Sequence, residues 1–183
     1  MTYEAFPTPE EQPELPELEL TIDLLTATPD EIILEADRLR GIADLEEAAS
    51  ATEEERTRIR KESWHHQQLL ALETSMVQMI TEHPAQGWGL FNALRTHESA
   101  QHRLHATDFI IPLLTNDVKG VEPNPSRTLE AWKQLIGDEN STVSYEAQEL
   151  IFDVLHPQST ELARNLTLHQ MSSILWHLLE GDS

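Results

Sequence analysis

Apolar side chains recur along most of the chain at the three- and four-residue steps of an amphipathic helix. The first such pattern follows Thr28-Pro29-Asp30-Glu31, which combines a capping residue, a proline suited to the first helical position and the glutamate of a capping box. We therefore predict a helix from Thr28 to about Ala49. Its apolar stripe consists of Ile32, Ala36, Leu39 and Ala43, widened by Ile42.

A second capping box, Thr52 with Glu55, predicts a long helix that reaches Thr81. Its first half, residues 53–66, has almost no apolar face, so we expect it to project into solvent or against a partner. Its second half repeats apolar side chains at alternating three- and four-residue steps, which is typical of a packing seam. The seam consists of Leu69, Leu72, Met76 and Met79.

The remaining pattern predicts shorter helices. After an interruption at Pro84 and at Gly87-Trp88-Gly89, a helix is expected from about Leu90, and Pro112 should kink or end it. A loop follows over 115–125. Further helices are expected at 125–136, where Gly137 closes the helix, and at 141–155, 160–165 and 167–179. The predicted fold is all-α, an irregular multi-helix bundle with at most one short strand.

One segment, 18–24, has a different period. Leu18, Leu20, Ile22 and Leu24 alternate with polar residues, as in a half-buried strand, although a short amphipathic turn of helix fits as well. A lone strand needs an edge to pair with, which could belong to this fold, to another copy of the chain or to a different protein.

Charge divides the chain unevenly. The 33 Asp and Glu outnumber the 12 Lys and Arg, giving a net charge of −21, and residues 1–55 alone hold 17 of the acids and two of the bases. Four prolines lie among the glutamates of residues 1–17, and this composition predicts no packed element there. We therefore divide the chain into an acidic, Pro-rich arm, 1–27, and a helical domain, 28–183.

Composition excludes several classes of function. A charge of −21 opposes binding to nucleic-acid phosphates, and the last predicted helix, which might suggest a helix-turn-helix, holds no Lys or Arg. The chain has no cysteine, which excludes disulfides, thiolate metal sites and a cysteine nucleophile. No apolar run is long enough for a membrane span, and the acidic start does not resemble a signal peptide. We expect a cytoplasmic protein without a cofactor.

The chemistry-bearing residues are densest between His97 and Asp108. If this stretch is helical, Glu98, His102 and His105 lie one turn apart and could face one Zn²⁺ or Fe²⁺, since these ions accept imidazole and carboxylate. The spacing is not the H-E-x-x-H of zinc proteases, and Arg103 would repel a cation. A polar, solvated helix face is the alternative. There is no phosphate-binding loop, nucleophile elbow or local triad, so we expect no catalytic residues.

The charge layout favours a non-enzymatic protein that binds another protein, as an adaptor, assembly chaperone or inhibitor does. The partner is expected to be basic or assembling, and self-association is a further option. The expected contact residues are Leu18, Leu20, Ile22, Leu24, Asp30, Glu31, Glu46, Glu47, Glu53, Glu54 and Glu55. The alternatives are a nucleic-acid mimic that blocks a DNA- or RNA-binding protein, a metal-dependent helical-bundle enzyme, and acidity that serves only solubility.

Overall fold

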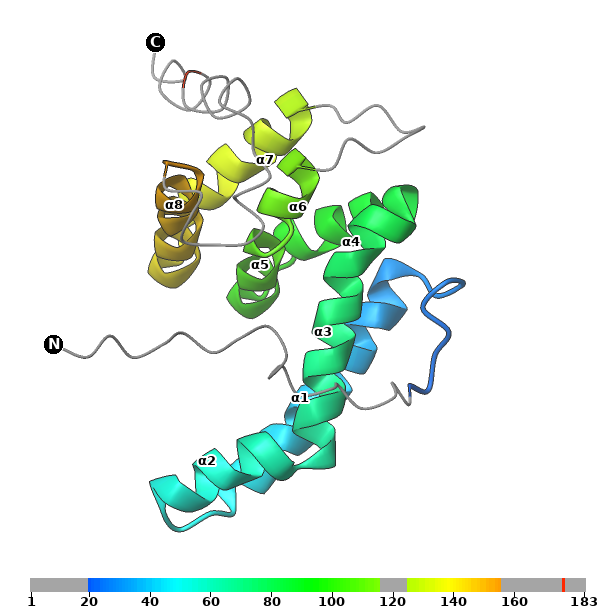
Figure 1. Cartoon of the computed structure of the whole chain (residues 1–183), viewed down its shortest axis with the longest axis vertical. Helices are drawn as coiled ribbons and strands as arrows, with labels where there is room; N and C mark the ends of the chain where they lie inside the picture. The colour runs from blue at the N-terminus through cyan, green and yellow to red at the C-terminus, as the bar shows by residue number, and fades with distance from the viewer. Residues whose placement is uncertain (1–19, 116–124, 156–175, 177–183) are drawn as a thin grey trace, which may run out of the picture.

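The computed structural model describes residues 20–115, 125–155 and 176, and these residues form eight α-helices and no strand (Figure 1). The predicted all-α class is confirmed. The helices are α1 (Pro29–Ala48), α2 (Glu53–Glu62), α3 (Trp64–Glu82), α4 (Pro84–Arg95), α5 (Ala100–Thr107), α6 (Ile110–Thr115), α7 (Pro125–Ile136) and α8 (Ser141–Leu155). The helices predicted at 160–165 and 167–179 and most of the loop at 115–125 lie outside the described residues.

The start of α1 is as its sequence predicts. The Glu31 amide donates to Thr28 Oγ1 at 3.3 Å, and the Thr28 amide donates to the Glu31 carboxylate at 2.7 Å, which completes the capping box. The predicted stripe is buried, from Ile32 through Ala36 to Ala43.

The long helix predicted from Thr52 to Thr81 is wrong, because it is broken at Ser63 into α2 and α3. Ser63 has the extended backbone of a helix cap, with φ −65° and ψ 130°, and its Oγ accepts from the His66 amide. The same hydroxyl donates to Glu46 at the end of α1. The break lets α2 fold back along α1 instead of projecting alone, although α2 buries none of its side chains.

The predicted interruption at Pro84 is confirmed, since α3 ends at Glu82 and α4 begins at this proline, where a missing N–H costs nothing. The predicted interruption at Gly87-Trp88-Gly89 is wrong, because these residues belong to α4. Gly87 lies inside α4, and a Cβ at this position would come within 2.7 Å of the Ile80 backbone nitrogen. The glycine is therefore what allows α4 to lie directly against α3. The single helix predicted from Leu90 to Pro112 is instead three helices, α4, α5 and α6, with Pro112 in the first turn of α6.

The core lies where α1, α3 and α4 meet, and it continues through α5 and α6 to α7 and α8 (Figure 1). Met76 and Met79 of the predicted seam are buried in it. Phe91 and Phe109 stack in its middle, with ring centroids 6.1 Å apart. Trp132 of α7 is fully buried and donates from Nε1 to the Ala147 carbonyl of α8 at 2.7 Å, so the last two described helices are joined by packing and by a hydrogen bond.

No strand forms in the described part of 18–24, which is residues 20–24. Leu20, Ile22 and Leu24 are nevertheless half-buried while Thr21 and Asp23 are exposed, so the alternation correctly separates inward from outward side chains. The three apolar side chains pack against the core of the same chain rather than along a strand edge. Thr21 donates from its amide and its hydroxyl to the buried Glu35 carboxylate, at 3.1 and 2.9 Å, and this anchors the segment to α1.

Candidate functional site

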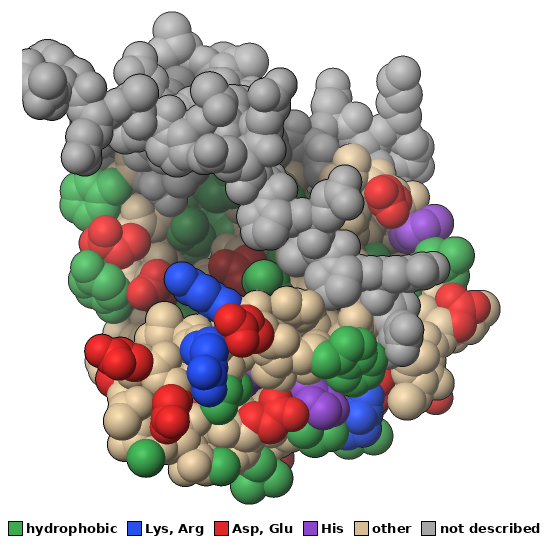
Figure 2. Space-filling model, turned by 60° about the horizontal axis from the view of Figure 1, so that its bottom comes forward, with side chains coloured by type: hydrophobic (Ala, Val, Ile, Leu, Met, Phe, Trp, Pro, Cys, Tyr) green, Lys and Arg blue, Asp and Glu red, His purple; other side chains and the backbone are tan. Residues whose placement is uncertain are grey.

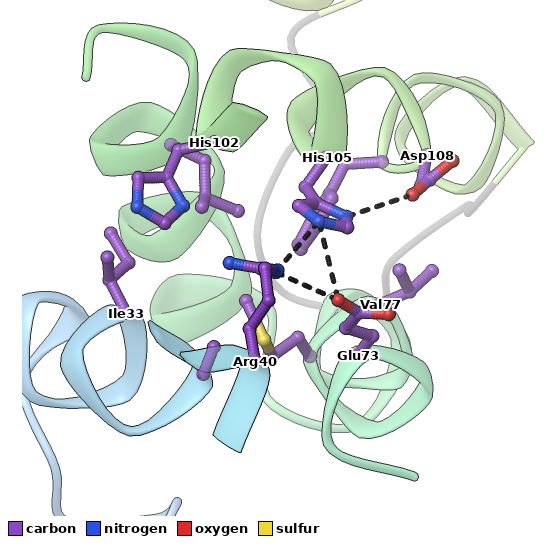
Figure 3. A pocket seen from close by; sticks show the side chains of 11 residues that line it. Ile33, Arg40, Glu73, Val77, His102, His105 and Asp108 are labelled. Carbon is purple, nitrogen blue, oxygen red and sulfur yellow. Dashed lines mark hydrogen bonds and ion pairs between the residues drawn. The ribbon is translucent and has the colours of Figure 1, made fainter. Parts of the chain in front are cut away.

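Titratable side chains gather where α1, α3 and α5 meet (Figure 3). Arg40 Nη2 lies 3.0 Å from Glu73 Oε1 and 2.9 Å from His105 Nε2, and His105 Nδ1 lies 3.8 Å from Asp108 Oδ2. His105 Nε2 also lies 3.3 Å from Glu73 Oε1, so the Arg40 guanidinium and the His105 imidazole meet at one carboxylate oxygen.

His102, one turn before His105, points to a different partner. Its Nε2 lies 3.1 Å from Asp37 Oδ2 on α1, and its ring meets that of His97 edge-on at 4.2 Å. Burial lowers the pKa of His102, and the nearby Asp37 carboxylate opposes this shift. Asp37 also accepts from Arg40 Nη1 at 3.0 Å, so the two groups belong to one polar network between α1 and α5.

The cleft at this network is too small for a substrate, because it has room for about one water molecule. Ligand pockets usually enclose about 300–1,000 Å³. Its polar groups already bind one another, and its remaining lining is apolar, including Ile33, Met76 and Phe109. The arrangement joins three helices and leaves little free capacity for chemistry.

The three candidate metal ligands do not converge. Glu98 is exposed and precedes α5, which begins at Ala100, so the helical spacing from Glu98 to His102 does not exist. His102 faces Asp37, whereas His105 faces Glu73. Within the described ranges, no group of three or more His, Asp or Glu side chains is arranged to hold a metal ion.

Several of the acids expected to contact a partner have partners within the chain. Glu31 belongs to the cap of α1, and hydrogen bonds from Thr28 lower its pKa. Glu55 accepts from the Ala51 amide at 3.0 Å, at the start of α2. Local backbone groups therefore hold these two carboxylates at helix starts.

The facing sides of α1, α2 and α3 hold three more of these acids. Glu46 accepts from Ser63 and from His65 Nδ1, and the Ser63 hydroxyl is the main reason that the pKa of Glu46 is lowered. Glu47 binds Arg60, whose Nε lies 2.9 Å from Glu47 Oε2, and Glu53 lies 3.5 Å from Arg56. Three of the expected contact acids therefore have partners within the chain, in or beside the hairpin formed by α1 and α2.

Asp30, Asp44 and Glu54 have no hydrogen bond or ion pair among the described residues. Asp30 and Asp44 lie on the outer side of α1, opposite its buried stripe, and Asp37 lies between them on the same side. Figure 2 shows the end of the molecule that carries the hairpin, where acidic side chains are spread among hydrophobic and basic ones.

Two leucines also lie on this outer side of α1, which the sequence analysis did not identify. Leu34 is 69% exposed and Leu45 is 72% exposed. They are three helical turns apart and so share one face, with Gly41 between them. We call Asp30, Leu34, Asp37, Gly41, Asp44 and Leu45 the outer face of α1. The available signal was that both leucines lie outside the helical period of the buried stripe.

Of the other contact residues expected from the sequence, Leu18 lies outside the described residues. Leu20, Ile22 and Leu24 pack against the core. The structure thus separates the apolar segment, which is used internally, from the acids of α1 and α2.

Comparison with family models, with curated proteins and with solved structures found no match. No helix in the described part of the chain is both long and apolar enough to cross a membrane.

Proposed function

We propose that this chain is a non-enzymatic protein-interaction protein that binds a basic segment of another protein through the outer face of α1. The observation that carries the proposal is the pair Leu34 and Leu45, about 70% exposed and accompanied by aspartates. The two leucines lie about 16 Å apart along the helix axis on one face, and a partner segment lying along α1 would contact both.

The charges on this face support a basic partner. Asp30 and Asp44 have no partner among the described residues, and Asp37 is 46% exposed beside its contacts with Arg40 and His102. Of the two arginines of α1, Arg38 is held by the buried Glu35 at 2.7 Å, and Arg40 is largely buried and also binds Glu73. A second copy of the same face would place aspartates against aspartates, which disfavours self-association here.

The nucleic-acid mimic fits this face less well. Asp30, Asp37 and Asp44 recur every seven residues on an ordered helix, about 10 Å apart along its axis. The two leucines on the same face, Leu34 and Leu45, have no counterpart in a phosphate backbone. A mimic would therefore bind its target without them, and added DNA or RNA would compete with it.

The test uses the full chain as bait in quantitative pull-downs from the native host, with paired variants. Leu34→Ser with Leu45→Ser should abolish capture of a specific partner, whereas Leu70→Ser, at an exposed leucine on α3, should leave it unchanged. Asp30→Asn, Asp37→Asn and Asp44→Asn together should slow association about tenfold at low salt and much less at high salt.

Three results would contradict the proposal. The first is capture that is insensitive to both sets of changes, and the second is capture lost equally with Leu70→Ser. The third, capture that needs the aspartates but not the leucines and that nucleic acid displaces, would favour the mimic.

A further inference from the structure

A second candidate site lies away from the outer face of α1, in an open cleft between α4 and α7. The cleft encloses about 290 Å³, which is at the lower end of the range for small-molecule sites. Its polar lining comes from both helices and consists of Trp88, Asn92, Arg95, Arg127, Glu130 and Gln134.

The helical spacing explains how these side chains come to face one another. Trp88, Asn92 and Arg95 follow at steps of four and three residues, so they form one face of α4. The α7 residues do the same at steps of three and four. Because α7 packs mainly against α6 and α8, its polar face is left turned to that of α4. Arg95 Nη1 donates to Gln134 Oε1 and links the two sides of the cleft.

Arg95 differs in its partners from three other arginines of the fold. Arg38, Arg40 and Arg103 each bind a carboxylate at 3.0 Å or less. Arg95 instead donates to two neutral amide oxygens, Asn92 Oδ1 at 2.8 Å and Gln134 Oε1, and contacts no carboxylate in the part of the chain that the structure describes.

Arg95 therefore keeps a positive charge and unused N–H donors with which it can bind a ligand. A guanidinium has five N–H donors, and the two amides use two of them. No ion pair with a described residue neutralises its charge, although the chain carries −21 overall. An oxyanion is the group that best matches a planar set of charged donors.

We propose that this cleft binds a small molecule through a carboxylate or phosphate group, with Arg95 as the principal contact. The Gln134 amide nitrogen provides a further donor, whereas the Asn92 amide nitrogen already donates to the Trp88 carbonyl at 3.0 Å. Trp88, which is half-buried beside Phe91, offers an apolar surface to the remainder of the ligand. Glu130 is the one carboxylate that lines the cleft, and it disfavours anions and limits their affinity.

The test is isothermal titration calorimetry of the full chain with malonate and with inorganic phosphate, each against NaCl of equal ionic strength. We expect saturable binding of one ion per chain. Arg95→Gln should weaken it about tenfold or more, because a charge-assisted contact is lost, and Arg95→Lys should weaken it less. Preference for malonate or for phosphate would identify the ligand group.

Two further variants keep the test decisive even if Arg95→Gln disturbs folding. Glu130→Gln changes an exposed residue, and it should tighten binding about threefold by removing a like charge. Arg58→Gln changes an exposed arginine of α2 that has no partner among the described residues, and it should leave binding unchanged. The proposal would be overturned if malonate and phosphate gave the same heats as NaCl. It would also be overturned if neither Arg95→Gln nor Glu130→Gln changed the affinity.

Discussion

The two ends of α1 are held to the molecule by different forces. From Ile32 to Ala43 it places apolar side chains in the core, where Ile32, Ala36 and Leu39 are at most 3% exposed. Its last turn meets α2, which buries no side chain, and the Ser63 that follows α2, through contacts such as Glu47 with Arg60 and Glu46 with Ser63.

This difference teaches that one continuous helix can be firmly anchored at one end and weakly at the other. Burial of apolar side chains contributes about 1.5–3 kcal/mol for each large residue, whereas exposed ion pairs contribute little and are screened by salt. The hairpin end should therefore open without unfolding of the core, and the two regions should respond to different perturbations.

The largest effect is expected from a charge placed in the apolar region. Met76 is 4% exposed on α3, and Met76→Asp would leave an unpaired carboxylate in the core. We expect a loss of ~3–5 kcal/mol in the free energy of unfolding, measured by chemical denaturation. Leu70→Asp, at a position of α3 that is 55% exposed, is the matched control and should be nearly neutral. Equal effects of the two variants would contradict the placement of the core.

Acid should affect the anchored part of α1 through Glu35. The Arg38 guanidinium donates hydrogen bonds to Glu35, and these lower the pKa of Glu35 from 4.5 to about 2. Burial opposes this shift, and hydrogen bonds from Thr21 add to it. A folded-state pKa below the unfolded value contributes stability above about pH 4.5, and this contribution is lost as the pH falls towards 2.

Glu35→Gln should therefore cost no more than ~3 kcal/mol at neutral pH, and it should flatten the pH dependence of unfolding in that acidic window. Thermal unfolding across a pH series measures both, with the exposed Glu98→Gln as control. An unchanged slope in the variant would show that Glu35 is not the group responsible.

Replacing Gly87 and Gly41 by alanine should change the free energy of unfolding in opposite directions. Gly87→Ala would bring a Cβ within 3.0 Å of the backbone of Met79 and Ile80, so α3 and α4 would have to separate, at a cost of ~1–3 kcal/mol. Gly41→Ala meets nothing within 4 Å on α1, and it should stabilise by up to about 1 kcal/mol. Denaturant midpoints of the two variants provide the measurement, and a shared sign would refute the close approach at Gly87.

The smallest effect is expected in the hairpin and should remain local. Glu47→Gln removes the main partner of Arg60, so amide hydrogen exchange in α2 should speed up while that in α4 does not change. High salt should reduce the difference between variant and wild type. Glu54→Gln is the control, because Glu54 has no partner among the described residues. A matching change in the core amides would mean that the two regions open together.

The sequence predicts what depends on local pattern. Spacing alone predicts the capping box of Thr28 and Glu31 and the burial of Ala36 and Met76. The structure contains all of these features. The break at Ser63 does not follow, because the contact that favours it is with Glu46, 17 residues earlier. Gly87 was interpreted as a chain interruption for a similar reason, since its role depends on how closely α3 approaches.

The candidate sites were harder to predict than the fold. Arg40 and His105 are 65 residues apart, and their contact has no local signature. Counting acids directs attention to residues 1–55, but a count cannot separate Glu47, which binds Arg60, from Asp44, which does not have a partner among the described residues. The cleft at Arg95 depends on two helix faces that only the tertiary fold places opposite each other.

The absence of buried residues in α2 has a consequence for how this protein can evolve. Substitutions along its ten residues change charge and shape at the surface without creating a cavity or strain in the core. As long as the residues favour a helix and Arg60 keeps its contact with α1, selection can vary the others freely. The hairpin can therefore diverge rapidly among descendants of this chain, while the core formed by α1, α3 and α4 changes slowly.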